Sequence, residues 1–422
     1  MRRFNFKKIV WCCIAIVLVN GFIGSLVVHA KPSPMLSVLI QEAMRSNPQI
    51  KAARDRWLAA NHAIPQARAL PDPMINAGYI NMSGNIPGDV DPRKEQMLGG
   101  SQEIPFPGKL VVRGRIATLE AKRAVADYQA TSLAVIAQLK RIYYDLYFVN
   151  KSINILQKNQ LLLEDMEQSA RTNYSVGKTP QQDVFRAQTE ISRLLMRLVI
   201  LRQERASLEA DINRLLNRSL DIAINTPSTL SVTSMRYDIK HFDALLKRRS
   251  PQLKMQQRNV EKGRQGVQLS KMDYFPDVEI EGGRLHDTAM HTKGYQVLLK
   301  ATVPLYFMQK QNNGVRESLA RYNAEIEDLH TTYQTLSFQV KNAFLLAQRS
   351  AQLIQLIQYT IIPQATLTFT SSQATYGVGK VDFLTLLNNL LTLQENELEL
   401  HSEIVQHEKA ITQIEETTGT FL

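Results

Sequence analysis

The sequence predicts a mainly α-helical protein with a small β part, built as two tandem repeats of one unit. Three observations predict this class. Long stretches contain no proline, several short motifs occur twice at an offset of about 200 residues, and each half contains short segments in which apolar and polar residues alternate. A chain of 422 residues has room for one large domain or for two to three ordinary ones.

The N-terminal segment, residues 1–30, is typical of a secretory signal peptide. A basic start precedes the apolar run Ile9–Val19, and the segment ends in Val28-His29-Ala30, which suits signal peptidase. An uncleaved membrane anchor is the alternative, because the apolar stretch approaches membrane-spanning length. Both cysteines, Cys12 and Cys13, lie inside this segment. A mature chain that begins at Lys31 would therefore offer no thiol for a disulfide, a nucleophile or a metal site.

The internal repeat defines the expected organisation of the rest of the chain. Four motifs recur in the same order, which chance similarity between helical segments would not produce. We therefore expect a first structural repeat over 31–230 and a second over 231–422. The matched motifs are Asn47–Lys51 with Ser250–Lys254, Pro73 with Pro276, Ile104-Pro105 with Val303-Pro304, and Tyr174–Lys178 with Tyr376–Lys380.

The proline-free stretches predict helices that are too long for a globular core. A helix interior excludes proline, and none occurs between Pro107 and Pro180. A helix over Lys109–Tyr174 would be roughly 100 Å long at 1.5 Å per residue, whereas the mean helix has about 11–12 residues. Such a rod must pack side by side with others. We expect it to turn at Gly177 and form a helical hairpin over 109–217, with a second hairpin over 309–418 that turns at Gly379.

The second helix of each hairpin carries apolar residues at seven-residue spacing, which indicates coiled-coil packing. The helix after Pro180 is expected to begin with Thr179 as its cap and Gln182 closing a capping box. The seven-spaced rows are Val184, Ile191, Leu198, Arg205, Ile212 and Ser219 beside Ala187, Leu194, Leu201, Leu208 and Leu215, and then Leu386, Leu393, Leu400, His407 and Ile414 beside Phe383, Leu390, Glu397, Ile404 and Ile411.

Strands are expected at about 73–82 and 95–105 in the first repeat and at about 277–285 and 294–304 in the second. Apolar and polar residues alternate in these segments, most clearly in the last of them. Their length suits tilted transmembrane strands with an apolar face toward lipid and a polar face toward a wet lumen. A small soluble sheet is the alternative. Four strands cannot close a barrel and a sheet edge cannot face lipid, so a membrane-spanning sheet would require several copies of the chain.

The chain resembles the TolC-type outer-membrane efflux proteins from about Leu36 to Ile414. The motifs that carry the resemblance are Asn47-Pro48, Leu70–Pro73, Ile104–Lys109, Tyr174–Lys178 with Gln182–Val184 and Ala187-Gln188, and Tyr376–Lys380. The resemblance implies a homotrimer in the outer membrane of a Gram-negative cell. Three chains would form a 12-stranded β-barrel on an α-helical periplasmic tunnel. This passive exit duct would dock through a periplasmic adaptor onto an inner-membrane pump. The stretch Pro105–Lys109 is most similar to the branch that serves heavy-metal efflux.

The resemblance also implies where the partner contacts and the periplasmic entrance lie. The adaptor would meet the hairpin tips, and the residues just beyond the tips would narrow the entrance. The family often carries acidic residues six and nine positions beyond the second tip's glycine, where this chain has Thr385 and Asn388. The tip residues are Tyr174, Val176, Gly177, Lys178, Tyr376, Gly377, Val378, Gly379 and Lys380, and the entrance candidates are Asp183, Asp382, Thr385 and Asn388.

Other function classes find little support in the sequence. The net charge is +11, but no basic cluster with interleaved aromatic residues predicts nucleic-acid binding. Neither phosphate-binding glycine motif occurs before a helix, the histidines are dispersed, and no catalytic triad is evident from the spacing. We therefore expect no enzyme activity, cofactor or resident metal. Export of drugs or heavy-metal ions is the main interpretation, a component of a protein secretion system is the alternative, and a periplasmic adaptor or scaffold is a third.

Overall fold

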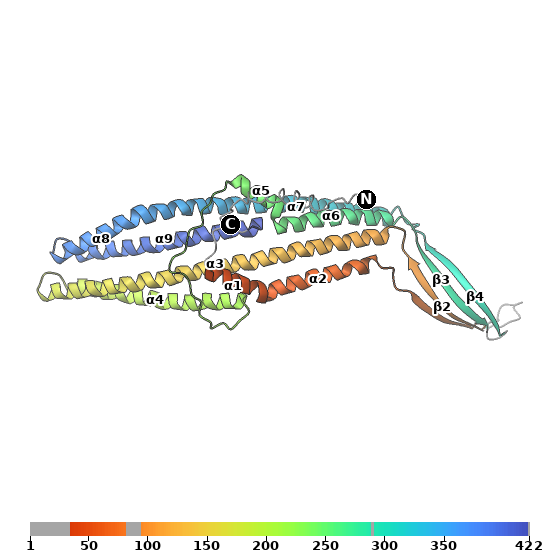
Figure 1. The fold of residues 1–422 in the computed structure, drawn as a ribbon, viewed down its shortest axis with the longest axis horizontal. Coiled ribbons are helices and arrows are strands. Elements are labelled where there is room, and N and C mark those ends of the chain that lie inside the picture. The colour runs from red at the N-terminus through yellow and green to blue at the C-terminus, as the bar shows by residue number, and fades with distance from the viewer. Residues whose placement is uncertain (1–33, 82–93, 288–290, 421–422) are drawn as a thin grey trace, which may run out of the picture.

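The computed structural model describes residues 34–81, 94–287 and 291–420, so the expected signal peptide 1–30 and most of the expected loop 83–94 lie outside the described residues. The molecule is a long bundle of helices with a sheet at one end (Figure 1). The elements are α1 Pro34–Ser46, α2 Pro48–Arg68, β1 Met74–Asn81, β2 Lys94–Ile104, α3 Lys109–Ser175, α4 Gln182–Leu215, α5 Ile239–Arg249, α6 Pro251–Met272, β3 Asp277–Asp287, β4 Thr292–Thr302, α7 Lys310–Leu356, the π-helix η1 Ile357–Ile361, α8 Ile362–Gly377 and α9 Phe383–Thr418.

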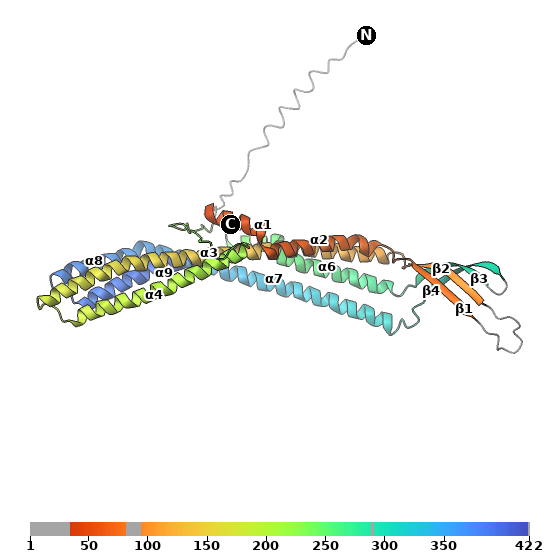
Figure 2. The same cartoon turned by 90° about the horizontal axis from the view of Figure 1, so that it is seen from below.

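Two long helical hairpins run side by side along the molecule (Figure 2). The first joins α3, a continuous helix of 67 residues, to α4. The second joins α7, η1 and α8 to α9, and it passes through Pro363 without ending. Proline has no N–H to donate, so the helix loses one backbone hydrogen bond at Pro363. The π-helical turn just before it accommodates this loss, and the helix continues. None of the helices in the described ranges combines the length and the apolar character that crossing a membrane requires.

The start of α4 differs from the sequence expectation. The helix begins at Gln182, and its N-cap residue, Gln181, makes no capping hydrogen bond through its side chain. The predicted cap at Thr179 and the predicted start at Pro180 are therefore wrong. The chain is still turning there, because Asp183 N–H donates to the carbonyl of Pro180 and Val184 N–H to that of Gln181. The helix also ends at Leu215, so Ser219 lies outside the row in which it was placed.

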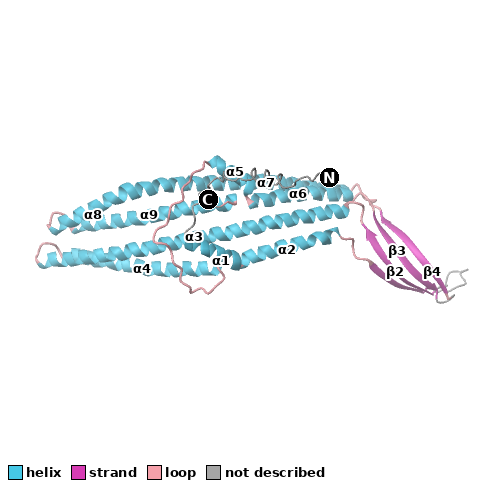
Figure 3. Ribbon diagram, in the orientation of Figure 1, coloured by secondary structure: helices cyan, strands magenta, loops and turns pink. Residues whose placement is uncertain are grey.

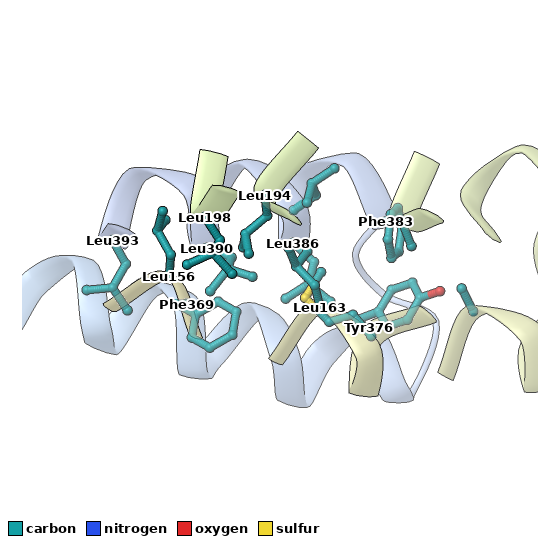
Figure 4. Packing of buried hydrophobic residues seen from close by; sticks show 14 of the residues in the cluster. Leu156, Leu163, Leu194, Leu198, Phe369, Tyr376, Phe383, Leu386, Leu390 and Leu393 are labelled. Carbon is teal, nitrogen blue, oxygen red and sulfur yellow. The ribbon is translucent and has the colours of Figure 1, made fainter. Parts of the chain in front are cut away.

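The core near the hairpin tips is a four-helix seam in which the predicted apolar rows interlock (Figure 4). Leu194 and Leu198 of α4 and Leu390 of α9 are buried against Leu163 of α3 and Phe369 of α8. Arg205, in contrast, is exposed. Burying each such leucine stabilises the packed state by about 1.5–3 kcal/mol, so the seam holds the two hairpins together as one rod.

The four strands form one antiparallel sheet in the order β1-β2-β3-β4, coloured magenta in Figure 3. The sequence predicted two hairpins, and the structure joins them by pairing β2 of the first repeat with β3 of the second. Glycines permit this approach. A Cβ on Gly99 would lie 2.6 Å from the carbonyl oxygen of Gly282, which is closer than any side chain tolerates. The mainly α fold with a small sheet is thus confirmed.

The junction of helices and sheet is formed by the Pro105–Lys109 stretch. Phe106 stacks on Phe275 with ring centroids 4.4 Å apart, and its N–H donates to Asp277 Oδ1 at 2.6 Å. The buried Lys109 Nζ pairs with Asp277 at 2.9 Å and with Asp273 at 3.2 Å. These contacts tie the start of α3 to the end of α6 and the start of β3, so the motif has a structural role.

Three ion pairs lie midway along the rod, where α9 packs on α3, and the first of them is buried. Lys140 of α3 pairs with Glu415, and Arg141 pairs with Glu416. Lys409 and Asp145 form a third pair across the same two helices. These ion pairs set the register between α3 and α9.

The segment between α4 and α5 is held on α9 by a polar clamp. The fully buried His407 has Nδ1 2.9 Å from the carbonyl oxygen of Ala347 and Nε2 2.8 Å from that of Thr233. Thr233 in turn donates to the Glu408 carboxylate through its N–H at 2.7 Å and through its hydroxyl at 2.8 Å. Burial raises the pKa of Glu408, the Thr233 bonds and His407 lower it, and the charge of Glu415 raises it further. His407 is therefore a structural connector between distant segments.

Candidate functional site: the hairpin tips and the sheet faces

Both hairpin tips end in the same backbone turn. Gly177 and Gly379 each have φ of +74°, a left-handed conformation that favours glycine. Gly177 N–H donates to the carbonyl of Tyr174 and Lys178 N–H to that of Asn173, and the second tip repeats both bonds from Gly379 and Lys380. This is the pattern of a Schellman helix end. The two tips lie next to each other at the end of the molecule far from the sheet (Figure 1).

Although the two tips share one backbone, they present different side chains. Tyr376 is only 5% exposed and packs edge-on against Phe383, with ring centroids 5.8 Å apart, whereas Tyr174 is 45% exposed. Val176 and Val378 are exposed at the two apices, together with Lys178 and Lys380. Each tip thus presents an exposed apolar residue beside an exposed cation.

Asp183 lies in a pocket of about 330 Å³ between the two tips. The lining includes Thr179 and Asp183 from the first hairpin and Tyr376 and Asp382 from the second. Burial raises the pKa of Asp183, Arg186 lowers it, and the charge of Asp382 raises it. Burial likewise raises the pKa of Tyr376, and the charge of Asp183 raises it further. The structure thus brings these two entrance candidates and Tyr376 together.

The other entrance candidates lie on the first turns of α9. Asp382 caps this helix, accepting from Thr385 N–H at 2.7 Å and from the Thr385 hydroxyl at 3.1 Å. The backbone bond from Thr385 is the main cause that lowers the pKa of Asp382. Thr385 and Asn388 are exposed. The capping role of Asp382 could have been predicted from its position before an apolar-periodic run.

Asp183 and Asp382 are expected to affect tip stability with opposite pH dependence. The folded pKa of Asp183 is raised, so its ionisation weakens the tip as pH rises from about 3.8 through the folded value. The folded pKa of Asp382 is lowered, so its contribution is lost as pH falls below about 3.8. We expect Asp183→Asn to increase amide protection of residues 173–186 at pH 7, measured by hydrogen exchange, and Asp382→Asn to decrease protection at the start of α9. Equal effects of both variants would contradict this assignment.

The tip glycines allow a matched test of backbone conformation. A Cβ added to Gly379 or to Gly377 meets no atom within 4 Å, but only Gly379 has a positive φ. Gly379→Ala is therefore expected to cost about 1–2 kcal/mol, and Gly377→Ala, inside α8, to stabilise by about 0.4–1 kcal/mol. Amide hydrogen exchange at the tip measures the effect. A comparable loss of amide protection in both variants would show that steric crowding by the added methyl group, and not the positive φ, destabilises the tip.

One face of the sheet is apolar and exposed. Paired residues on antiparallel strands share a face, and the register places Ile75 of β1, Leu98 of β2, Ile280 of β3, and Val297 and Leu299 of β4 on the same side. Val297 is 78% exposed and Ile75 85% exposed. A soluble sheet buries its apolar face, and this one does the opposite.

The other face is polar, and part of it is covered. Glu103, Glu279 and Lys300 lie opposite one another on β2, β3 and β4, and Glu281, which pairs with Lys300, is only 4% exposed. With an apolar exposed side and a polar covered side, the sheet has the arrangement of a membrane-spanning sheet around water.

Three comparisons with known proteins bear on these features. The model of the family described as outer membrane efflux protein matches residues 39–218 and 244–415, which is most of the chain. The chain belongs to the outer membrane efflux protein family. It is thus a channel protein of the outer membrane and not an enzyme. No curated protein matches this family member in sequence.

Solved structures share the fold of this outer membrane efflux protein at low sequence identity. The outer-membrane channel OprN is 18% identical, with a TM-score of 0.81 over 92% of this chain and 90% of that one. The outer membrane protein VceC of Vibrio cholerae is 16% identical, with a TM-score of 0.80 over 92% and 97%. The MtrE outer membrane channel of Neisseria gonorrhoeae is 16% identical, with a TM-score of 0.76 over 92% and 90%.

The efflux protein offers no metal cluster within the described residues. No three His, Cys, Asp or Glu side chains there converge in a way that could hold a metal ion. Among the dispersed histidines, His286 lies within β3 and His291 directly precedes β4. The register also places Arg284 and Lys293 on the apolar face of the sheet. The sequence analysis did not single out these two cations, because they come together only through strand pairing.

Proposed function

We propose that this protein is the exit duct of a tripartite efflux system, a homotrimer that passively conducts drugs or heavy-metal ions from the periplasm to the exterior. Three sheets side by side would close one 12-stranded barrel in the outer membrane. The helical hairpins would form the periplasmic tunnel beneath it.

The observation that carries the proposal is a sheet whose apolar face is exposed and whose two edge strands are, among the described residues, unpaired on their outer sides. Its apolar face is exposed, and β1 and β4 each have one neighbour among the described strands. Lipid accepts an apolar face but not an unpaired strand edge, because unsatisfied N–H and C=O groups cost several kcal/mol each there. Pairing β4 of one chain with β1 of the next satisfies both edges.

The hairpin tips support an adaptor contact in the periplasm. Their exposed valines and lysines repeat in both hairpins, so a trimer would present six similar tips in a ring. Asp183 and Asp382 lie just behind them and would face cargo at the entrance.

Two classes of cargo fit the proposed duct: small molecules, including metal ions, and proteins. The resemblance of Pro105–Lys109 to the heavy-metal branch places metal ions among the candidates, although this stretch joins helices to sheet here. Secretion of a protein is the second candidate, because a tunnel of this architecture does not select its cargo by itself.

Membrane fractionation with gel mobility of unheated and boiled samples tests the proposal. We expect an outer-membrane oligomer of about three times the monomer mass that dissociates on boiling, as barrel closure by three four-stranded sheets requires. A deletion strain should become sensitive to drugs or metal salts, and the full chain should restore resistance. A periplasmic monomer would overturn the duct and favour a scaffold.

A further inference from the structure

The apolar face of the sheet ends in cations at its loop end. On this face, the last row that crosses all four strands contains Tyr79, Gln96, His286 and Lys293, and the next row contains Ala77, Leu98, Arg284 and Tyr295. Arg284 and Lys293 are exposed. Both rows lie at the end of the sheet that is farthest from the helices (Figure 1).

Most residues of these two rows, all but Tyr295, help to line a hollow of about 690 Å³. Arg284, His286 and Lys293 contribute to its lining, with Tyr79 and Leu98 beside them. Within the described part of the chain, neither Arg284 nor Lys293 pairs with a carboxylate, whereas Lys300, nearer the helices, pairs with Glu281. The hollow therefore combines unneutralised positive charge with apolar walls.

Carboxylates at this end lie on the opposite side of the sheet. Glu95 pairs with Asp287 in the register, next to the pair of Gln96 and His286. Successive residues of a strand point to opposite faces, so Glu95 and Asp287 lie on the polar face. The charges are thus separated across the sheet, cations on the apolar face and acids on the polar one. The two tyrosines belong to the cationic side, where the amphipathic rings of a membrane-interface belt lie.

We propose that Arg284, His286 and Lys293 bind the phosphate groups of an anionic lipid of the outer leaflet, whose acyl chains lie along the apolar rows below. This rests on the membrane placement proposed above. A charged side chain on a lipid-facing surface is tolerated best near the headgroups, and a phosphate there supplies the missing counter-charge. A trimer would carry three such sites.

The test uses the purified oligomer in non-ionic detergent. Phosphatidylglycerol is titrated against it, and the temperature at which the oligomer dissociates on a gel is followed. The site variant is Arg284→Gln/Lys293→Gln. The matched control, Arg236→Gln/Lys240→Gln, removes the same two charges from exposed positions just before α5 and in its first turn. Parallel titrations use phosphatidylcholine and inorganic phosphate, and every variant is first fractionated.

We expect phosphatidylglycerol to raise the dissociation temperature of the wild type and of the control at similar concentrations. The site variant should still reach the outer membrane as an oligomer but require about 30-fold more phosphatidylglycerol, as expected for two lost surface cations. An equal response of both variants, or the same rise with phosphatidylcholine, would overturn the site. A rise with inorganic phosphate alone would assign it to free phosphate. A wild type without outer-membrane oligomers would overturn the duct itself, and this inference with it.

Discussion

Replacing Lys140 by methionine is expected to destabilise the protein by about 3–5 kcal/mol, the usual cost of removing one partner from a buried ion pair. Lys140 and Glu415 are both almost fully buried between α3 and α9. Glu408 lies close enough that the charge of Glu415 raises its pKa. Without the lysine, two buried carboxylates would repel each other in a region of low dielectric. The thermal unfolding of the detergent-solubilised protein at pH 7 measures the effect.

Two control variants test whether the loss of stability comes from the buried charge. Lys158→Met breaks a longer pair with Glu397 in which the lysine is 65% exposed, and a surface pair of this kind contributes about 0–1 kcal/mol. The double variant Lys140→Met/Glu415→Leu removes both charges of the pair and should recover most of the lost stability, because Glu415 no longer lies buried without its lysine or beside Glu408. A Lys140→Met variant as stable as Lys158→Met would show that water reaches this part of the bundle.

Replacing Val297 by arginine is expected to abolish the outer-membrane oligomer. Val297 lies in the middle row of the exposed apolar face, one row from Arg284 and two rows from Lys293. A charge on a lipid-facing strand costs about 2–4 kcal/mol at the bilayer midplane, and a trimer bears this cost three times. The readout is the fraction of protein in the outer membrane as an oligomer that dissociates on boiling.

Gln296→Arg is the matched control, because the neighbouring side chain points to the polar face. This variant also introduces an arginine into β4, but on the opposite face, and it should leave the oligomer intact. If Gln296→Arg disrupted assembly and Val297→Arg did not, the lipid-facing and lumen-facing sides would have to be exchanged. If neither variant had an effect, the sheet would not lie in lipid.

Local patterns in the sequence were sufficient for most elements of the fold. The proline-free stretch after Pro107 predicted α3, the seven-residue rows predicted the buried Leu194, Leu198 and Leu390, and alternation predicted the apolar side of β4. Each pattern follows from backbone geometry, 3.6 residues per helical turn and two per strand repeat, so it can be recognised without knowledge of distant contacts.

Several features of the candidate site depended on residues far apart in the chain. Tyr174 and Tyr376 occupy equivalent motif positions, but only Tyr376 is buried, because it packs into the apolar core that the two hairpins share and Tyr174 does not. Thr179 has the sequence of a cap and is not one, because the turn after Gly177 extends to Gln181.

The long helices, their apolar seams, the two turns at Gly177 and Gly379, and the strand segments could all be predicted from the sequence. The folded chain was needed to show that β2 pairs with β3, that His407 holds Thr233 against α9, and that Arg284 and Lys293 lie together on the apolar face. The difference lies in the sequence separation over which each interaction acts. Periodicity and turn chemistry act between residues a few positions apart, whereas strand register and the burial of polar groups are set by segments that meet only when the whole chain is folded.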